Sequence, residues 1–471
     1  MSGVKPPDRA MGQPGTFRPR RILEVELGTT ILPIEAEPSR DGSVDTGAWV
    51  LVRLHTWPIG IVELDLDDGA LTAGALGSGI WARHRSSIEA HLAADRLPVP
   101  SSLPLTGLGD PPDVPCLAAR RAFLAQAPRV SVVVPTADRP HLLAACLRDL
   151  RAQDYPAFEI LVVDNAPARS GAEGVVAELA GPDTAVPIRY VVEAHPGSSI
   201  ARNRGLGASE TEITAFVDAD VRVDRYWLAE LVRPIAEDPR IGCSTGLILP
   251  AELHTRAQGW MAEWGGYDKG FQPRLYDLEE NRGSGPLYPY QATIFGSGQS
   301  MAFRTGVLRR VGGFDLALGV RTHSEGGEDI GALLDVVLSG DRLAYAPGAI
   351  VWHPDPLDEA AFLRKLQSYG VGLTALLTRT AATHPGSAAA IAARVPAAAR
   401  YFFGASSARN ERQSTTFPRW PVWVAELRGM AWGPFAYALS RQSLRRNGRP
   451  GRRSGKGPGV AATTGIRRPQ A

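Results

Sequence analysis

The sequence predicts an α/β fold with a doubly wound parallel sheet, because strand-like apolar runs alternate with helical segments through its middle. Residues 130–134 read Val-Ser-Val-Val-Val, which is typical of a strand covered on both faces. Leucines at helical spacing follow and predict an amphipathic helix. The alternation predicts strands at residues 130–134, 158–163, 188–192 and 213–217, with helices at residues 142–150, 172–179 and 198–208 between them.

The bulk composition indicates a globular protein of two to three compact units. The chain has 471 residues, of which 44% are hydrophobic and 21% charged, and its formal net charge is +2. Such a charge does not call for a nucleic-acid partner. The 3 cysteines have no metal-type spacing, and an odd number argues against a disulfide framework. We therefore expect a reducing, cytoplasmic location.

Changes in composition and residue pattern divide the chain into a small N-terminal α+β unit, a central α/β domain and a helical C-terminal extension. In the N-terminal unit, two β-rich runs joined by the turn-prone His55-Thr56-Trp57-Pro58 precede an Ala-rich helical segment. No residue pattern in that unit points to chemistry. The expected ranges are a disordered tail at 1–20, the N-terminal unit at 21–95, a linker at 96–128, the central domain at 129–356, the helical extension at 357–440 and a basic disordered tail at 441–471.

Neither end of the chain predicts a membrane span. The first 20 residues are polar and lack a signal-peptide pattern. Residues 421–439 are the most apolar stretch, but they contain Glu426, Arg428 and Pro434, so a surface or interfacial helix is expected. Two interpretations stay open for this helix and the basic tail: peripheral contact with an anionic membrane, or a helix packed on the protein with a solvated tail.

Two carboxylates follow the last strand of the predicted parallel set. The sequence reads Phe-Val-Asp-Ala-Asp at residues 216–220, so Asp218 and Asp220 stand two positions apart at a strand end. Residues at that spacing project to one side, where their oxygens can share a divalent cation. Asp-x-Asp alone also occurs in many surface turns. The other motifs must decide between these readings.

Seven short motifs in a fixed order resemble family 2 glycosyltransferases of the GT-A fold. The resemblance covers roughly residues 129–356 and implies an inverting transfer from a nucleoside diphosphate sugar. The motifs are Val-Ser-Val-Val-Val-Pro-Thr at 130–136, Glu-Ile-Leu-Val-Val-Asp-Asn at 159–165, Ala-Arg-Asn-Arg-Gly at 201–205, Phe-Val-Asp-Ala-Asp at 216–220, Gly-Gly-Phe-Asp at 312–315, Gly-Glu-Asp at 327–329 and Trp-His at 352–353.

The resemblance assigns roles at the donor nucleotide and the metal. It implies that Asp164 accepts a hydrogen bond from a uracil edge. The alternative is a purely structural role, in which Asp164 is the N-cap of the following helix. Asp220 would bind Mn²⁺ or Mg²⁺ directly, with His353 completing the shell. The nucleotide-sugar site as a whole would comprise Pro135, Thr136, Arg139, Asp164, Arg202 and Asp218, the last also next to the metal.

The resemblance also implies the catalytic base and the acceptor side. Asp329 would take the acceptor proton, with its neighbour Glu328 as the rival, although both could merely cap the apolar helix expected at 330–338. Gly298 resembles the small-residue turn beneath the acceptor. Aromatic residues at helical spacing are candidates for stacking on sugar rings, and equally for core packing. They are Trp260, Trp264, Tyr267 and Phe271.

Departures from the family pattern narrow the expected activity. Ala166-Pro167 replaces the usual small polar pair after the second strand, and Thr416-Phe-Pro-Arg-Trp420 lacks the glutamine found in processive synthases. We expect a non-processive enzyme that uses a UDP-sugar and a glycan, glycolipid or small-molecule acceptor, in cell-surface polysaccharide or related assembly. Two alternatives stay open: a catalytically weak nucleotide-sugar-binding protein, and a sugar-phosphate nucleotidyltransferase, against which the lack of glycine at 134–140 counts.

Overall fold

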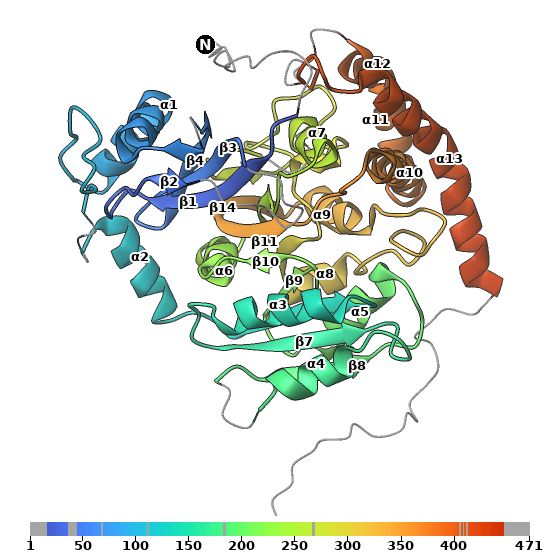
Figure 1. Ribbon diagram of the computed structural model, residues 1–471. Helices are drawn as coiled ribbons and strands as arrows, with labels where there is room; N and C mark the ends of the chain where they lie inside the picture. The colour runs from blue at the N-terminus through green and yellow to red at the C-terminus, as the bar shows by residue number, and fades with distance from the viewer. Residues whose placement is uncertain are drawn as a thin grey trace, which may run out of the picture.

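The computed structural model describes residues 17–446, apart from 36–44, 67–68, 110, 112, 182–184, 266–268, 405–406, 408 and 411–412. A large mixed sheet forms its centre (Figure 1). In sheet order its strands are β10 (Arg222–Val223), β14 (Arg342–His353), β11 (Ile241–Pro250), β13 (Ser300–Arg304), β9 (Ile213–Val217), β6 (Val130–Thr136), β7 (Phe158–Asp164) and β8 (Ile188–Val192), and β12 (Arg274–Tyr276) pairs with β14.

The predicted α/β alternation is confirmed. Strands β9, β6, β7 and β8 are parallel neighbours, as expected. Strand β13 runs antiparallel between β9 and β11, so the whole sheet is mixed rather than purely parallel. The helices between the parallel strands are α3 (Pro140–Arg151), α4 (Ala172–Leu179) and α5 (Ser198–Ala208).

Helices cover both faces of this sheet, and each face has its own core. Alternate residues of β6 enter different cores: Val132 and Val134 pack with α3, α4 and α6 (Trp227–Glu237), whereas Val133 packs with the other set. That second core includes side chains of α5, α8 (Thr305–Arg310) and α9 (Glu328–Leu338). Burial on both faces explains why the strand sequences are almost continuously apolar.

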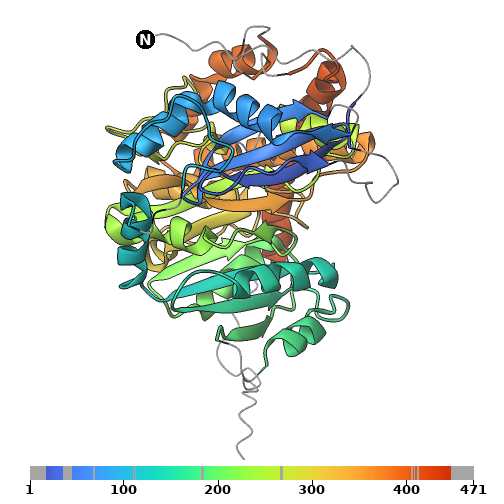
Figure 2. The same ribbon diagram turned by 60° about the vertical axis from the view of Figure 1, so that its left-hand side comes forward.

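The N-terminal unit is a three-stranded sheet with a long helix. Its strands are β1 (Arg20–Glu26), β3 (Gly47–Leu54) and β4 (Trp57–Asp65), and α1 (Ala73–Ala94) covers one face (Figure 2). A short pair, β2 (Ile34–Glu35) and β5 (Ala70–Leu71), and α2 (Pro115–Leu124) complete this part. The predicted strands and helix are confirmed here, the turn is confined to His55 and Thr56 because β4 already begins at Trp57, and the range expected to be a linker contains α2.

The opposite face of the N-terminal sheet packs on the central domain. Trp49 and Leu51 of β3 belong to the core that contains α5 and α9. A buried ion pair joins Arg53 Nη2 to Asp224 Oδ2 at 2.7 Å, beside the β10 strand. The N-terminal sheet is therefore held by both apolar packing and charge pairing.

Helices form the C-terminal part, as predicted. They are α10 (Glu359–Thr383), α11 (Ser387–Ala392), α12 (Val395–Phe403) and α13 (Arg419–Arg446), while α7 (Arg256–Trp264) and a 3₁₀ turn (Ala292–Ile294) lie between β11 and β13. Gly429 lets α13 approach α10 closely, since a Cβ there would lie 2.1 Å from the Gln367 carbonyl oxygen. Helix α13 runs past the expected boundary at 440, and basic residues in its last turn suit a helix C-terminus. Residues 447–471 of the expected tail, and 1–16 of the other, lie outside the described residues.

Among the described residues, no helix is long and apolar enough to cross a membrane.

Candidate functional site

The carboxyl ends of the parallel strands bring distant acids to one edge of the sheet. The last residues of β6 and β7, Thr136 and Asp164, pair across the sheet, and Val133 of β6 pairs with Phe216 of β9. Asp218, two positions beyond Phe216, therefore lies near Pro135 at the same edge. This edge is where doubly wound sheets bind their ligands.

Arg202 of α5 joins three elements at this edge. Its Nη2 donates to Asp218 Oδ1 at 2.8 Å, and its Nη1 donates to Glu328 Oε1 at 2.5 Å. Ser198 Oγ donates to the same Glu328 oxygen at 2.5 Å. The side chain of Arg202 is only 6% exposed, so the guanidinium is a buried bridge between the end of β9 and the start of α9.

Asp329 lies beside this bridge, in the first turn of α9. The helix begins at Glu328 after Gly327, whose positive φ of 88° is readily adopted by glycine, so the expected start at residue 330 was two positions late. Asp329 Oδ2 accepts hydrogen bonds from Gly298 N at 2.6 Å and from Ser297 Oγ at 3.3 Å. The N-cap position is occupied by Gly327 rather than by either acid.

Gly298 is the point at which the acid and the arginine meet the backbone. A Cβ at this position would lie 2.8 Å from Arg202 Nη2 and 2.9 Å from Asp329 Oδ2. Only a glycine leaves room for both side chains. Ser297 and Gln299, neighbours in the same turn, line the adjoining cavity and were not among the predicted site residues.

A large cavity opens at this cluster. It has a volume of about 1470 Å³, and Arg202, Asp218, Glu328 and Asp329 form part of its wall. Among the described residues, the rest of the wall combines aromatic rings with polar and basic side chains. These include Trp264, Tyr276, Tyr290, Tyr369, Tyr401, Lys269, Arg274, Arg321 and Lys365.

Burial and nearby like charges raise the pKa values of two acids of this cluster, Asp218 and Glu328. Loss of hydration raises the pKa of Asp218, with Asp220 and Asp329 adding to the effect and Arg202 opposing it. Burial likewise raises the pKa of Glu328, again against Arg202. The acids outnumber the cations that touch them, so this edge of the sheet attracts further positive charge.

Asp220 and His353 stand next to the same cluster. Asp220 Oδ2 lies 3.3 Å from Arg139 Nη1, and the Asp220 side chain is 31% exposed. His353 ends β14, and its Nδ1 lies 3.2 Å from Asp355 Oδ1. Among the smaller effects on Asp218, His353 lies near enough to lower the pKa of that carboxyl. Carboxylate oxygens and an imidazole nitrogen suit Mn²⁺ or Mg²⁺.

Asp164 is deeper than the other predicted residues. It is fully buried, and its carboxylate accepts hydrogen bonds from Ser170 Oγ at 2.5 Å, Tyr190 OH at 2.7 Å and Ala166 N at 2.9 Å. Its oxygens are thus engaged within the protein. Gly171 rather than Asp164 stands at the N-cap of α4, without a side-chain bond.

The aromatic run divides between core and cavity. Trp260 is 8% exposed and packs against Phe362, away from the cavity wall. Trp264 lines the cavity, stacks on Tyr369 with 5.4 Å between ring centroids, and donates to Glu426 at 3.1 Å. The common helical face does not exist, because α7 ends at Trp264 and Phe271 lies beyond it. Tyr267 is outside the described residues.

Removing the Glu328 charge should stabilise the protein at neutral pH. A buried acid with a raised pKa favours folding most below its unfolded pKa, and that contribution is lost as pH rises through the folded pKa. Glu328→Gln should therefore melt at a higher temperature than wild type near pH 7.5 in EDTA, and the gap should close toward pH 4.5.

The control for this comparison is Glu178→Gln on the surface of α4. We expect its melting temperature to follow wild type at every pH. A Glu328→Gln protein that melts lower than wild type at pH 7.5 would show that the Arg202 pairing outweighs the desolvation of Glu328.

Comparisons with known proteins find similarity mainly in the central part of the chain. Residues 131–311 match the family described as glycosyl transferase family 2. The chain is 27% identical over 198 residues to the pre-mycofactocin glycosyltransferase of Mycobacterium tuberculosis, covering 41% of this chain and 38% of that protein. It is 29% identical over 237 residues to the succinoglycan biosynthesis protein ExoM of Rhizobium meliloti, covering 49% of this chain and 69% of that protein.

A solved mannosyltransferase from Pyrobaculum calidifontis, in complex with GDP-mannose and Mn²⁺, aligns with 68% of this chain and 76% of its own at 21% identity and a TM-score of 0.40. The chain spans under two fifths of the length of the Mycobacterium relative. The family match includes the strands that carry Asp164 and Asp218 and the helix that carries Arg202. The match with glycosyl transferase family 2 thus extends from residue 131 to residue 311 and includes Asp164, Arg202 and Asp218.

Proposed function

We propose that this protein transfers a sugar from a nucleoside diphosphate sugar, UDP-linked, to an acceptor hydroxyl, with inversion and without processive elongation. The observation that carries the proposal is the convergence of Asp218, Glu328 and Asp329 around Arg202 on the cavity wall. The cavity is larger than the roughly 300–1,000 Å³ of usual small-molecule pockets, which suits a donor and an acceptor held together.

Asp329 is the proposed general base. Both of its hydrogen bonds among the described residues go to Oδ2, so Oδ1 is left to accept a proton. As Oδ1 takes the proton of the acceptor hydroxyl, that oxygen forms a bond to the anomeric carbon, and the bond from this carbon to the diphosphate breaks. Attack from the face opposite the diphosphate inverts the configuration. Fixing Oδ2 on the backbone of Gly298 keeps the base in position.

The residues around Asp220 are the proposed site of a divalent cation. Asp220, Asp218 and His353 would hold Mn²⁺ or Mg²⁺, and the excess of acids over cations supports such a site. The Asp355 contact to His353 Nδ1 would orient the ring as outer-sphere partners usually do. When bound, the ion would neutralise charge on the departing diphosphate. Pro135, Thr136 and Arg139 remain the proposed donor contacts, and Asp164 would join them only after its bonds to Ser170 and Tyr190 break.

Asp329→Asn should lower the transfer rate by about 10²–10⁴-fold, because an amide cannot take the acceptor proton. Nucleotide affinity should change little, since Asp329 acts on the acceptor. Sugar-donor turnover and UDP binding by calorimetry measure the two effects. Asp113→Asn is the control, because that side chain is 96% exposed on the N-terminal side of α2.

Unchanged turnover in Asp329→Asn would remove Asp329 from the role of base. Wild-type protein that binds nucleotide sugars but never releases nucleoside diphosphate would favour the binding-protein alternative.

Donor and metal should stabilise the protein together. We expect UDP-sugars with Mn²⁺ to raise the melting temperature more than either alone, because a ligand of the folded state shifts unfolding by mass action. Asp220→Asn should lose most of the Mn²⁺-dependent part. A larger shift with GDP-sugars would overturn the UDP assignment, and equal shifts with and without Mn²⁺ would overturn the metal assignment.

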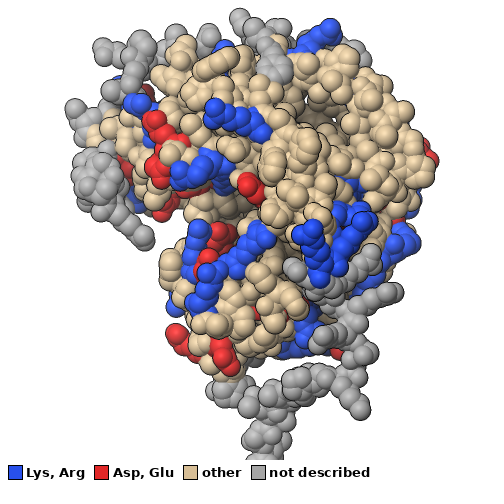
Figure 3. Space-filling view, turned by 90° about the vertical axis from the view of Figure 1, so that its right-hand side faces the viewer, with Lys and Arg blue, Asp and Glu red and all other residues tan. Residues whose placement is uncertain are grey.

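The outer face of α13 is the proposed membrane contact. Its exposed residues are mainly apolar: Trp420 is 71% exposed, Phe435 65% and Trp432 45%. Figure 3 faces the side on which α13 lies; its upper part is mostly uncharged, and Lys and Arg side chains gather lower down. Apolar side chains beside basic ones suit a helix lying on an anionic lipid surface. The basic tail beyond 446, also proposed to contact the membrane, lies outside the described residues.

Replacing Trp432 and Phe435 together by serine should reduce co-sedimentation with vesicles of anionic phospholipid, because it removes exposed apolar side chains without altering charge. The control is Leu275→Ser together with Val192→Ser. This pair also replaces two exposed apolar side chains by serine, but outside α13. Equal sedimentation of both double variants would contradict a role for α13.

A further inference from the structure

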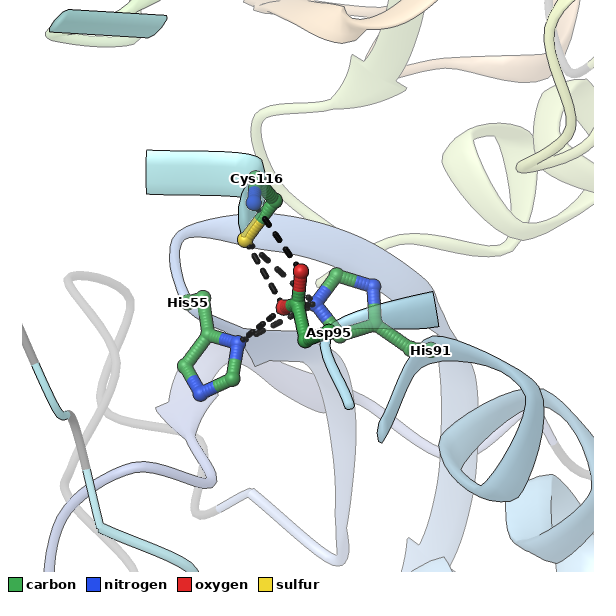
Figure 4. A group of neighbouring side chains, drawn as sticks. All are labelled: His55, His91, Asp95 and Cys116. Atoms are coloured by element: carbon green, nitrogen blue, oxygen red, sulfur yellow. Dashed lines mark hydrogen bonds and ion pairs between the residues drawn. The ribbon is translucent and has the colours of Figure 1, made fainter. Parts of the chain in front are cut away.

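Four side chains from three segments meet in the N-terminal unit. In the sequence they lie far from Asp218, Glu328 and Asp329. His55 comes from the turn between β3 and β4, His91 and Asp95 come from the end of α1, and Cys116 comes from the first turn of α2 (Figure 4). No residue pattern in the sequence of this unit predicts chemistry, and the cysteines have no metal-type spacing. The available signal was a histidine and an aspartate four positions apart at the end of a helix.

The donor atoms of this cluster surround a common point. Asp95 Oδ2 lies 2.8 Å from His55 Nδ1, 3.2 Å from His91 Nε2 and 2.9 Å from Cys116 Sγ. His55 Nδ1 and His91 Nε2 are 3.2 Å apart, and Cys116 Sγ lies 3.9 Å from His91 Nε2. All four atoms lie within 4.8 Å of one another. In tetrahedral zinc sites, bond lengths of about 2.0–2.3 Å place ligand atoms about 3.2–3.7 Å apart, which is close to these values.

Hydrogen bonds alone do not explain why these four side chains lie so close together. Cys116 Sγ donates its S–H to Asp95 Oδ2. Two imidazole nitrogens approach that same oxygen, so three prospective donors crowd an atom with two lone pairs.

We propose that His55, His91, Asp95 and Cys116 bind one zinc ion. The set of two imidazoles, one carboxylate and one thiolate gives four ligands of the kind zinc prefers, and four protein ligands are typical of a structural site. Zinc binding would displace the thiol proton, turning three competing hydrogen bonds into four metal bonds. The chain's own backbone supports the set, because Cys116 N donates to Asp95 Oδ1 at 2.9 Å and orients the carboxylate.

The turn that carries His55 is held in an unusual conformation. His55 and Thr56 have positive φ angles of 52° and 67°, which residues other than glycine rarely adopt. Glu26 fixes this turn, since its carboxylate accepts from His55 N at 3.0 Å and Thr56 N at 2.9 Å. His55 is 1% exposed. The imidazole is thus presented to the cluster by a turn that the surrounding chain maintains.

The ion would also secure the N-terminal unit to the central domain. Arg120, one helical turn after Cys116, donates from Nη1 to Thr56 Oγ1 at 2.5 Å and from Nε to Glu230 Oε1 at 2.9 Å. Glu230 belongs to α6 of the central domain. A cavity of about 210 Å³, lined by the cluster together with Arg120 and Glu230, gives an ion a way in.

Elemental analysis of the purified full-length protein tests the site. We expect about one zinc per chain in wild type, and loss of that zinc in both His91→Gln and Cys116→Ser. His84→Gln is the matched control on the same helix, because His84 bonds to the Ile61 carbonyl outside the cluster and should leave zinc unchanged. Asp220→Asn should also keep the zinc, which separates this site from the proposed catalytic metal.

Two measurements remain informative if a variant folds poorly. A chelator should lower the melting temperature of wild type reversibly, and added zinc should restore it. Cobalt exchanged into wild type should show a thiolate-to-cobalt charge-transfer band that Cys116→Ser lacks. Wild type without zinc and unaffected by chelator or added zinc, or zinc retained at wild-type level in both cluster variants, would overturn the proposal. Neither result would affect the proposed glycosyl transfer.

Discussion

The site depends on one buried guanidinium. Arg202 holds Asp218 at the end of β9 and Glu328 at the start of α9, two acids that would otherwise repel each other in a poorly hydrated place. Removing Arg202 from this buried cluster should cost about 3–5 kcal/mol, the usual loss when a buried charge loses its partner, because Asp218 and Glu328 would both be left without it. Arg202 therefore sets both the distance between the central strand and α9 and the position of the neighbouring Asp329.

That single cation does not balance the acids around it. Asp218 and Glu328 share Arg202, while Asp220 has a partly exposed contact with Arg139, and Asp329 relies on the neutral donors of the Gly298 turn. A divalent ion and the cationic side chains of the cavity would complete the charge balance when a diphosphate enters. Fold stability and ligand binding thus act on the same residues, as expected where a site is built from buried charge.

The N-terminal unit belongs to the same structure rather than to a loosely attached extension. Its sheet is covered by α1 on one face and by the central domain on the other, and two arginines, Arg53 and Arg120, reach acids beside β10 and in α6. The proposed zinc cluster adds a local cross-link between the β3–β4 turn, α1 and α2.

The sequence by itself determined the alternating strands and helices and the identity of most acids at the site. Apolar runs and helical spacing are local properties, and the motifs around Asp218 and Asp329 are short. Only the tertiary structure decided which side chains share a face: Trp260 turned into the core, Asp164 became buried in its own hydrogen bonds, and Arg202 became a bridge. The cluster of His55, His91, Asp95 and Cys116 was hidden for the same reason, because its members come from three segments that meet only when the chain folds.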